Sequence, residues 1–316
     1  MLVSILIPCF NAESWVAQAI QSALAQTWSE KEVIVVDDGS KDGSLEVIKS
    51  FGSRVHWETG PNRGGNVARN RLLELARGQW LQYLDADDYL LPPKIERQMG
   101  FLRNHPDCDV VYSPVLFVHC SKGRVEHEIS PIREPRDPWI LLARWWLPQT
   151  GGPLWRKRAL IDIGGWKPDQ PCCQEHELYL RLLQAGALFC YFEECHAAYR
   201  HWSPNGTLSK RNPAEVRLRR LEVMERMDAF LKSRGQLTPV RLNALNQARF
   251  EIARSIWLED PSEAREIVQE IKRRQRGFVP EPPAARARYR LVYKALGFTA
   301  AERLAACARS LTGAMS

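Results

Sequence analysis

The chain lacks a long hydrophobic run. None of its 316 residues lies in an uninterrupted apolar stretch of about 18 to 20 residues, the length that a helix needs to cross a bilayer. The first residues, MLVSILIPCFNAESW, have no basic side chains ahead of their apolar part and reach Pro8 early. We therefore expect a first strand here and not a signal peptide.

The sequence also lacks a cysteine framework. Its eight cysteines include no CxxC pair and no spacing typical of a zinc site. Scattered cysteines of this kind are typical of a reducing compartment, so we expect a cytoplasmic protein. The length suits one large domain, or one domain with a substantial extension.

Two familiar phosphate-binding loops are missing. The glycine pair in NRGGNVARN matches neither a Walker A motif nor a G-x-G-x-x-G motif. The 44 Lys and Arg residues exceed the 37 Asp and Glu residues, giving a formal charge of +7. This excess suits a polyanionic substrate, anionic lipid or nucleic acid, and does not choose among them.

What the sequence does contain is an alternation of strand-like and helical segments over its first 200 residues. We expect strands at residues 3–7, 32–36, 55–58, 80–84, 110–118 and near 189–192. We expect helices at residues 12–25, 43–51, 66–76, 93–104 and 178–188. Such an order predicts βαβ units and an α/β fold with a mostly parallel sheet flanked by helices. The Pro- and Trp-rich stretch at 119–170 is expected to be irregular.

The pattern changes near residue 213. Leu221, Met224, Met227 and Leu231 recur at helical spacing, and further helical stretches follow. Basic residues gather in this part, between Lys272 and Lys294. The sequence therefore predicts an α/β domain at residues 1–212 and a helical, basic C-terminal extension at 213–316.

Carboxylates follow two of the expected strands. Asp85, Asp87 and Asp88 come directly after residues 80–84, and Asp37 and Asp38 follow residues 32–36. An Asp-X-Asp pair can reach one hard cation, and Mg²⁺ or Mn²⁺ is usually held by one or two carboxylates and substrate phosphates. These two strand ends predict a nucleotide diphosphate and its metal at the carboxyl edge of the sheet. The alternative in each case is a polar turn that caps the next helix.

Three further positions are candidates, each with a structural alternative. Phe10, at the end of the first strand, suits stacking on a base, or else covers the core beside Asn11 as cap of the helix at 12–25. Arg69 suits a diphosphate, or else is a solvated helix residue. His201 suits a metal or a phosphate, or else has a structural role.

A carboxylate opens the last helix of the α/β pattern. Glu175, in QEHELYLRL, stands where the helix dipole favours an ionised side chain, as a general base requires. The alternative is a helix cap, with Glu177 and Arg181 as a pair one turn apart. Tryptophan is dense around this region, and we expect one or two of these residues at a site: Trp139, Trp145, Trp146, Trp155, Trp166 and Trp202.

Taken in order, SILIPCFN, VVDDGSKDGS, ARN and YLDADD resemble the inverting family 2 glycosyltransferases with the GT-A fold, over about residues 1–210. The resemblance implies a nucleotide-sugar donor, usually a UDP-sugar, and a divalent metal, Mn²⁺ or Mg²⁺. It implies Glu175 as the catalytic base and Asp85 and Asp87 at the metal, with Asp87 as the direct ligand; His201 is a further metal candidate from its residue type alone. The residues then expected to bind the nucleotide sugar are Pro8, Phe10, Asn11, Asp37, Asp38, Arg69 and Asp85.

The late segment departs from the family pattern. Where the family usually has Glu-Asp before a Leu-rich helix, this chain has Gln174 and Glu175. It also lacks the Gln-X-X-Arg-Trp signature of processive synthases, so we expect a single addition. The resemblance implies a glycan, glycolipid or other hydroxyl acceptor in cell-surface polysaccharide or glycolipid biosynthesis. We expect a cytoplasmic protein. Its basic extension associates either with the acceptor or with the inner face of the membrane, or is a helical bundle packed on the catalytic domain with solvated cations.

Other functions remain open on the sequence. A sugar nucleotidyltransferase shares the sheet and the metal, but it normally has a glycine-rich basic loop after the first strand, and PCFNAESW is not one. A non-catalytic nucleotide-sugar-binding protein is the second alternative. A nucleic-acid-binding protein rests on the charge alone, and we expect no nucleic acid because no base-reading motif is present.

Overall fold

The computed structural model describes residues 1–121, 124–201 and 212–313. The chain divides into two compact units, residues 1–219 and 220–316, with the division inside one long helix. No helix of the described part has the length and hydrophobicity that crossing a membrane requires.

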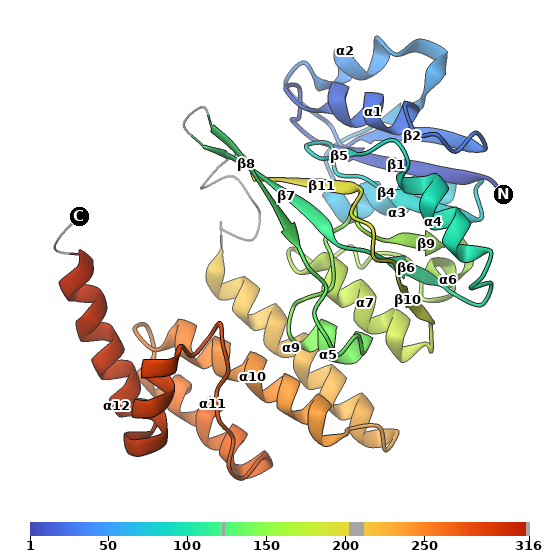
Figure 1. The fold of residues 1–316 in the computed structure, drawn as a ribbon. Helices are drawn as coiled ribbons and strands as arrows, with labels where there is room; N and C mark the ends of the chain where they lie inside the picture. The colour runs from blue at the N-terminus through green and yellow to red at the C-terminus, as the bar shows by residue number, and fades with distance from the viewer. Residues whose placement is uncertain (122–123, 202–211, 314–316) are drawn as a thin grey trace. The chain divides into compact units, whose positions relative to one another are not determined.

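In the described part of the first unit, the central layer is a seven-stranded sheet (Figure 1). Its strand order is β10-β6-β9-β4-β1-β2-β3. Neighbouring strands run parallel except at β9, which is antiparallel to both β4 and β6. The strands are β1 (Val3–Cys9), β2 (Lys31–Asp37), β3 (His56–Thr59), β4 (Trp80–Tyr83), β6 (Val110–Tyr112), β9 (Leu154–Arg156) and β10 (Phe189–Tyr191). The predicted mostly parallel sheet with flanking helices is confirmed.

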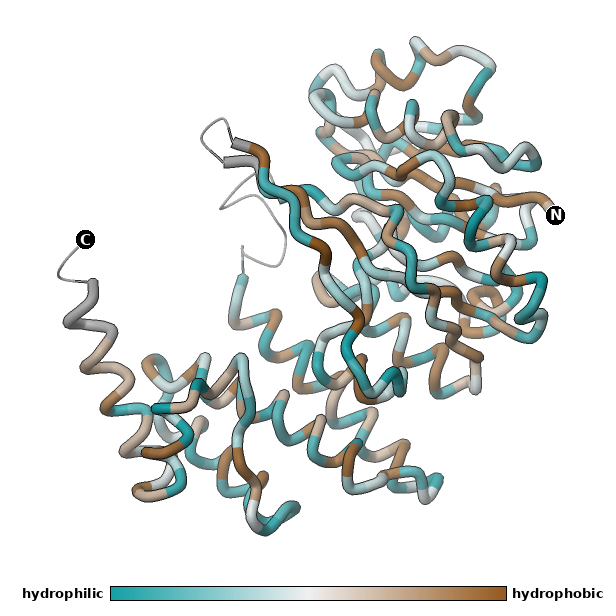
Figure 2. Tube along the Cα trace, viewed as in Figure 1, coloured by the Kyte–Doolittle hydropathy of each residue, from teal (hydrophilic) through white to brown (hydrophobic). Residues whose placement is uncertain are grey.

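Strand β1 forms the centre of the core. Its side chains from Val3 to Ile7 are buried on both faces, which is why the segment is an almost continuous hydrophobic run (Figure 2). One face packs against Val16 and Ile20 in the core that also contains Ile95. The helices of this unit are α1 (Val16–Leu24), α2 (Ser44–Lys49), α3 (Gly65–Leu75), α4 (Lys94–Leu102), α5 (Pro138–Ala143), α6 (Lys157–Asp162) and α7 (Gln174–Gln184), with a 3-10 turn at Gly52–Arg54.

A second, four-stranded sheet of the described residues carries the order β5-β11-β7-β8. Its strands are β5 (Tyr89–Leu90), β7 (Val115–Ser121), β8 (Arg124–Ser130) and β11 (Ala197–His201). Strand β11 is antiparallel to β5 and parallel to β7, and β7 with β8 forms the long hairpin seen in Figure 1. This sheet brings β11 beside the turn that precedes β5.

Two expectations about this region are wrong. The single strand expected at 110–118 is two strands, β6 and β7, in different sheets. Pro114 separates the two strands, because proline has no N–H to donate to a sheet ladder. The neighbouring Ser113 hydroxyl donates to the Gly152 carbonyl at 3.3 Å. The stretch 119–170, expected to be irregular, contains β8, α5, β9 and α6. Strand β9 is specified by pairing with β4 and β6, which local sequence patterns do not reveal, whereas β8 pairs with the adjacent strand β7.

The helix expected at 12–25 begins later, and Asn11 does not cap it. Helix α1 starts at Val16, after Trp15. Asn11 has a φ of 49°, its N–H donates to the Ser40 hydroxyl at 2.9 Å, and its side-chain oxygen accepts from the Lys41 N–H at 2.8 Å. Asn11 therefore fastens the loop after β1 to the loop after β2.

The described part of the second unit is helical, as the spacing predicts. It contains the end of α9 (Pro213–Ser233), then α10 (Pro239–Ile256), α11 (Pro261–Arg274) and α12 (Ala287–Gly313). Helix α9 buries Met224, Met227 and Leu231. Helix α12 is broken at Gly297, whose φ of 80° and ψ of −177° are tolerated essentially only by glycine. An aromatic core fills the unit and includes Phe250, Trp257, Phe278, Tyr293 and Phe298.

Candidate functional site

The carboxyl ends of β1, β2 and β4 meet at one edge of the central sheet. In the parallel register Cys9 pairs with Asp37, and the Asp38 N–H donates to the Cys9 carbonyl at 2.8 Å. On the other side of β1, Leu84 N–H donates to the Leu6 carbonyl at 2.9 Å. The two acidic strand ends and the aromatic after β1 are therefore brought to the same edge, as the sequence predicts.

Phe10 stands at this edge with 47% of its surface exposed. The alternative that it covers the hydrophobic core is therefore wrong. Of the residues around it, Pro8 is half-buried, Cys9 is buried and Asn11 is exposed. An exposed aromatic ring on a rigid strand end offers a face on which a planar base can stack.

Asp37 and Asp38 hold the loops of this edge. The Asp37 carboxylate accepts from the Thr59 hydroxyl at 2.7 Å. Asp38 accepts from the N–H groups of Arg63 and Gly64, both at 2.8 Å, and from the Asn62 amide at 3.2 Å. A carboxylate has about four lone-pair sites, so Asp38 retains acceptor capacity, on the oxygen that Arg63 alone contacts. The capping alternative is wrong for Asp38, because its carboxylate bonds to residues 62–64, and the N–H of Ser44 at the start of α2 donates to Asp42 at 3.1 Å.

Arg69 connects three parts of the site. Its guanidinium donates to Asp85 at 2.8 Å, to Gln174 at 3.2 Å and to Asn66 at 3.3 Å. The side chain is buried over the Trp166 ring, 4.9 Å from its centroid, so the alternative of a solvated residue is wrong. Burial alone would lower the pKa of Arg69, but the charges of Asp85 and then Glu175 raise it. The Nε group is buried with no hydrogen-bond partner among the described residues.

The DADD turn presents two half-buried carboxylates and one buried carboxyl. Asp85 and Asp87 are half-buried, whereas Asp88 is 2% exposed and accepts from the Arg200 N–H at 2.8 Å. Burial, followed by the charges of Asp87 and Asp85, raises the pKa of Asp88 well above its ordinary value. The side chain that accepts a first-turn N–H of α4 is Gln26, which accepts from Ile95 at 3.1 Å, so this cap does not come from the DADD turn.

Glu175 lies in the first turn of α7, and its carboxylate accepts from the Thr150 hydroxyl at 2.5 Å. Glu177, one turn away from Arg181, forms with it a 2.8 Å ion pair and is itself 1% exposed. The predicted Glu177–Arg181 pair is confirmed, and it leaves Glu175 as the half-buried carboxylate of this turn. The neighbouring Gln174 reaches Arg69, which brings the start of α7 to the DADD turn.

His201 lies on β11, next in sequence to Arg200, whose N–H donates to Asp88 of the DADD turn. Its ring stacks on His119, with centroids 4.8 Å apart and planes at 9°. The described residues contain no group of three or more His, Cys, Asp or Glu side chains arranged to hold a metal. Asp85 and Asp87 nevertheless fit the donor set of Mg²⁺ or Mn²⁺, which commonly takes one or two protein carboxylates and completes its shell with substrate phosphates and water.

Sequence reasoning missed three residues that the fold brings to the site. Arg200, which precedes His201, donates to the Asp87 carbonyl at 2.5 Å and to Gln18 at 2.6 Å. Burial is the largest cause that raises the pKa of Tyr199, and the charges of Asp88, Asp85 and Glu175 raise it further. Thr150 gave no signal, because it belongs to the stretch that was expected to be irregular.

A buried lysine lies beneath the Thr150 loop. The side-chain nitrogen of Lys94 donates to Gln98 at 2.8 Å and to the side-chain oxygen of Gln82. Gln82 donates in turn to the Gly151 carbonyl at 3.0 Å, and Gln98 to the Gly152 carbonyl at 3.2 Å. Burial lowers the pKa of Lys94 to about 7. The network fixes the two residues that follow Thr150.

Two of the tryptophans contact residues of the candidate site. Trp166 supports Arg69, and Trp145 stacks on His176, the residue after Glu175, with centroids 3.6 Å apart. Trp202 lies outside the described residues.

Comparison with known proteins identifies relatives of this domain. Residues 4–160 match the sequence model described as "Glycosyl transferase family 2". An uncharacterized glycosyltransferase of Haemophilus influenzae is 41% identical over 109 residues, which cover 33% of this chain and 44% of the relative. The chain spans about a third to under half the length of the curated relatives it matches first.

Solved structures share the fold. S. aureus TarS 1-349 in complex with UDP-GlcNAc matches with a TM-score of 0.60 and 15% identity, over 87% of this chain and 88% of that one. The mannosyltransferase PcManGT from Pyrobaculum calidifontis, in complex with GDP-Man and Mn²⁺, matches with a TM-score of 0.50 and 16% identity, over 85% and 78%. At these identities the likeness establishes the fold alone.

Proposed function

Residues 4–160 make this chain a member of glycosyl transferase family 2, and we propose that it moves a sugar from a nucleotide-diphosphate donor to an acceptor hydroxyl. The proposal rests on one observation above the others. A single buried guanidinium, that of Arg69, joins the DADD turn to the start of α7, where Glu175 lies. Arg69 thus links the turn of the proposed donor site to the helix start that contains the proposed base.

The proposed base is Glu175. Its carboxylate takes the proton of the acceptor hydroxyl while the acceptor oxygen bonds to the anomeric carbon and the bond from that carbon to the diphosphate breaks. Attack from the face opposite the leaving group inverts the anomeric configuration. General-base assistance of this kind contributes roughly 10²- to 10⁴-fold to a rate. The Thr150 hydroxyl, at 2.5 Å, orients the carboxylate and is a positioning residue.

The nucleotide site is proposed along the sheet edge. Phe10 stacks on the base between Pro8 and Asn11, Asp38 accepts from the base or ribose through its remaining lone pair, and Asp37 holds the loop that presents Asp38. The buried Nε of Arg69 is a donor without a partner in the described residues, beside the acidic turn. We propose that its guanidinium contacts the diphosphate.

A divalent cation, Mn²⁺ or Mg²⁺, is proposed at Asp85 and Asp87, with His201 as a further candidate ligand; when bound, it neutralises charge on the leaving diphosphate. Arg69 constrains Asp85 by occupying one of its oxygens. Arg200 constrains the neighbouring residue by bonding to the Asp87 carbonyl. These two arginines keep the carboxylates of the turn in a fixed place.

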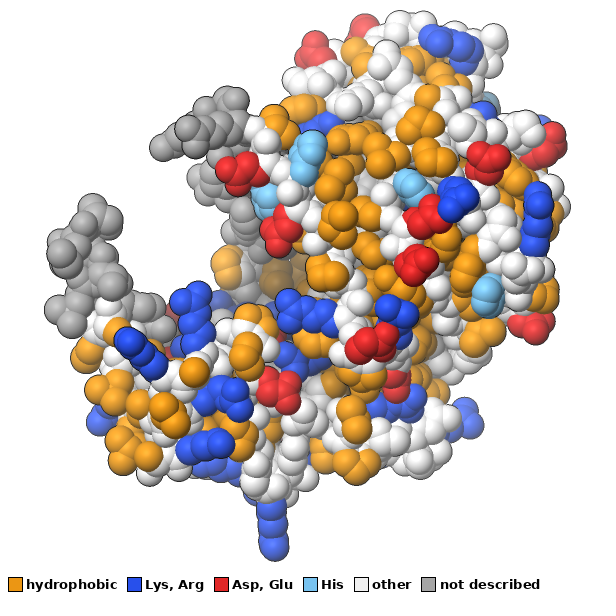
Figure 3. Space-filling view, in the orientation of Figure 1, with side chains coloured by type: hydrophobic (Ala, Val, Ile, Leu, Met, Phe, Trp, Pro, Cys, Tyr) orange, Lys and Arg blue, Asp and Glu red, His pale blue; other side chains and the backbone are white. Residues whose placement is uncertain are grey.

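The donor is proposed to be a UDP-sugar, and the acceptor a glycan, glycolipid or other hydroxyl compound in cell-surface polysaccharide or glycolipid synthesis. Residues 1–212 are proposed as the catalytic domain. The extension at 213–316 is proposed to associate with the inner face of the membrane, the protein itself being cytoplasmic. Support comes from its cations: on the face drawn in Figure 3, the second unit shows more Lys and Arg than Asp and Glu.

Isothermal titration with UDP and with GDP, each with Mn²⁺ and with EDTA, tests the donor proposal. We expect UDP to bind more tightly than GDP and to lose affinity in EDTA. Equal UDP affinity in both conditions would remove the metal from the mechanism. Release of pyrophosphate from a nucleoside triphosphate and a sugar phosphate would instead identify a nucleotidyltransferase.

A further inference from the structure

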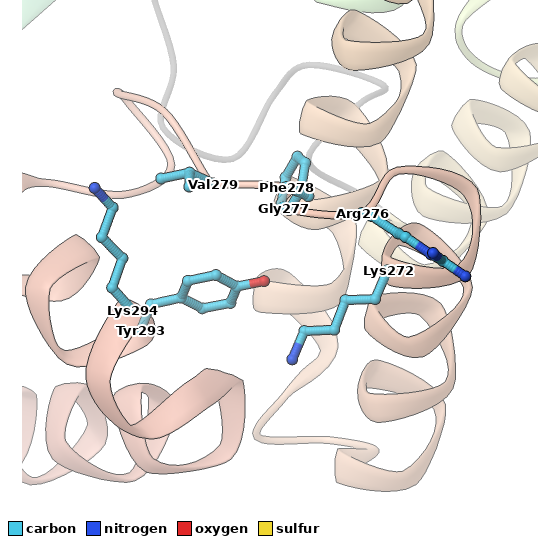
Figure 4. A pocket seen from close by; sticks show the side chains of 7 residues that line it. All are labelled: Lys272, Arg276, Gly277, Phe278, Val279, Tyr293 and Lys294. Atoms are coloured by element: carbon cyan, nitrogen blue, oxygen red, sulfur yellow. The ribbon is translucent and has the colours of Figure 1, made fainter.

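A pocket in the second unit combines basic side chains with one tyrosine (Figure 4). It is formed by the end of α11, the loop that follows and the first half of α12. Its lining residues are Lys272, Arg276, Gly277, Phe278, Val279, Tyr293 and Lys294. No carboxylate is among them, so the lining carries three positive charges.

These cations differ from their neighbours in having no acidic partner. Elsewhere in the unit, Arg249 pairs with Asp228 at 3.0 Å and Arg273 pairs with Glu270 at 2.8 Å. Lys272, Arg276 and Lys294 have no carboxylate partner in the described part of the chain. The Lys272 ammonium lies 5.8 Å from the centroid of the Tyr293 ring. Their charge is therefore available to a ligand.

The Tyr293 hydroxyl is a second, independent observation. The residue is 5% exposed, and its oxygen is buried without a hydrogen-bond partner among the described residues. A buried hydroxyl that is left unpaired destabilises a fold, and nearly all such groups are paired in native proteins. In Figure 4 the hydroxyl end of Tyr293 and the ammonium end of Lys272 face the same space, with Arg276 and Lys294 extending on either side.

We propose that this pocket binds a phosphate group. The Tyr293 hydroxyl donates one hydrogen bond to a phosphate oxygen, and Lys272 supplies a charge-assisted second one, with Arg276 and Lys294 at the rim. A phosphate monoester carries about −1.5 to −2 charge and three acceptor oxygens. It therefore matches three unpaired cations and a free hydroxyl better than a singly charged carboxylate does.

The group belongs either to a free phosphorylated compound or to a lipid headgroup, because both present the same oxygens. The pocket lies entirely within residues 220–316, and none of the residues proposed to bind the nucleotide lines it. Its ligand is thus independent of the proposed transfer reaction.

The test compares three variants of the full chain. Lys272→Ala/Lys294→Ala removes two pocket cations, one on α11 and one on α12. Arg273→Ala/Arg288→Ala removes the same charge from the same two helices, at residues that do not line the pocket. Tyr293→Phe removes only the hydroxyl. Inorganic phosphate is titrated into each by calorimetry, and UDP is titrated in parallel to show that the nucleotide site is intact.

We expect Lys272→Ala/Lys294→Ala and Tyr293→Phe each to weaken the binding of inorganic phosphate at least about ten-fold, the usual loss for a hydrogen bond to a charged group. The Arg273/Arg288 control should bind as the natural chain does. Without phosphate, Tyr293→Phe should melt at the same or a higher temperature, because it removes an unpaired buried hydroxyl. Equal phosphate affinity in all four proteins would overturn the proposal.

A vesicle arm identifies the source of the phosphate. Phosphatidylcholine vesicles with and without phosphatidic acid are sedimented with each protein. Retention of the natural chain by phosphatidic acid, lost in Lys272→Ala/Lys294→Ala and kept in the arginine control, assigns the pocket to a lipid headgroup. Phosphate binding without retention assigns it to a free compound. If neither probe distinguishes the pocket variants from the control, the pocket does not bind phosphate.

Discussion

At the scale of single residues, the site depends on how neutral and charged side chains share one guanidinium. Gln174 stands where the family resemblance implies a glutamate, and it accepts from Arg69 without adding charge. Asp85 is therefore the carboxylate that contacts Arg69 directly within the described residues. Glu175 is left to bond with Thr150, which suits a carboxylate that must accept a proton.

Replacement of Glu175 by Gln should abolish most transfer and leave nucleotide binding nearly intact. The change keeps the size and the Thr150 contact but removes the charge that a base needs, so we expect a loss of roughly 10²- to 10⁴-fold in kcat. Transfer is followed by UDP release and binding by UDP titration. Glu177→Gln is the comparison, since it breaks the Arg181 pair and should act mainly on stability. Retention of activity in Glu175→Gln would move the base elsewhere.

Replacement of Phe10 by Ala should weaken UDP binding, and replacement by Tyr should be tolerated. The exposed ring costs the fold little when removed, so melting temperature should change little in either variant. Stacking is worth about 1–3 kcal/mol per base in single-strand binding, which is an upper guide here. UDP titration measures the difference; unchanged affinity in Phe10→Ala would exclude stacking at this position.

At the scale of elements, the loop before β9 is held in place by a buried polar network. Gln82 on β4 donates to the Gly151 carbonyl, and Gln98 on α4 donates to the Gly152 carbonyl. Lys94 on α4 donates to both glutamines. A neutral amine has two N–H groups, which match the two glutamine oxygens that it contacts. The position of Thr150, and through it of Glu175, therefore depends on residues from two elements of the core.

The stability contribution of Lys94 should increase with pH. Burial lowers its folded pKa to about 7, against an unfolded value of about 10.4. Between these values the unfolded chain binds more protons, so the folding free energy becomes more favourable as pH rises. The melting temperature of the natural chain minus that of Lys94→Met should accordingly become more positive from pH 7 to pH 10. The same difference for Lys49→Met, at an exposed residue of α2, should not change in this way. A constant difference for Lys94→Met would contradict the buried neutral amine.

At the scale of the whole molecule, the chain contains two units with separate hydrophobic cores. The aromatic core of the second unit consists of residues from Phe250 to Ala301, all outside the first unit. A buried ion cluster supports this core region, in which Asp228 accepts from Arg249 at 3.0 Å, Lys232 at 3.2 Å and Arg274. Separate cores predict two unfolding transitions, with UDP stabilising only one.

The transition that UDP leaves unshifted should weaken at acid pH. Burial alone would raise the pKa of Asp228, but Arg249, Lys232 and Arg274 outweigh burial and hold it below its ordinary value. A carboxylate with a depressed folded pKa stabilises above its unfolded pKa of about 3.9 and loses that contribution as pH falls through the folded value. Asp228→Asn should remove this dependence and cost about 3–5 kcal/mol at neutral pH. Calorimetry from pH 7 to pH 3 measures it, with exposed Glu266→Gln as control. One transition that responds as a whole would refute separate units.

The sequence by itself determined the alternation of β1 to β4 with α1 to α3 and the residues at the carboxyl ends of β1, β2 and β4. These features are local, because each acidic turn, DD or DADD, directly follows its own strand. The mostly parallel sheet follows from that order, and it brings Phe10, Asp38 and Asp85 to one edge. The helical second unit was equally readable from the spacing of Met224, Met227 and Leu231.

Only the tertiary structure decided which distant residues meet. Thr150 reaches Glu175 across 25 residues, Lys94 reaches the same loop from α4, and Arg200 reaches Asp88 across 112 residues. The split of residues 110–118 between two sheets depends on pairing with β9 and β11, which no local pattern specifies. The phosphate pocket likewise depends on which cations contact a carboxylate in the folded chain. The sequence shows one basic cluster. In the fold, Arg273 and Arg274 both form ion pairs with Glu270, whereas Lys272, Arg276 and Lys294 have no carboxylate partner in the described residues. Charge is a property of the sequence, but its neutralisation is a property of three-dimensional contact.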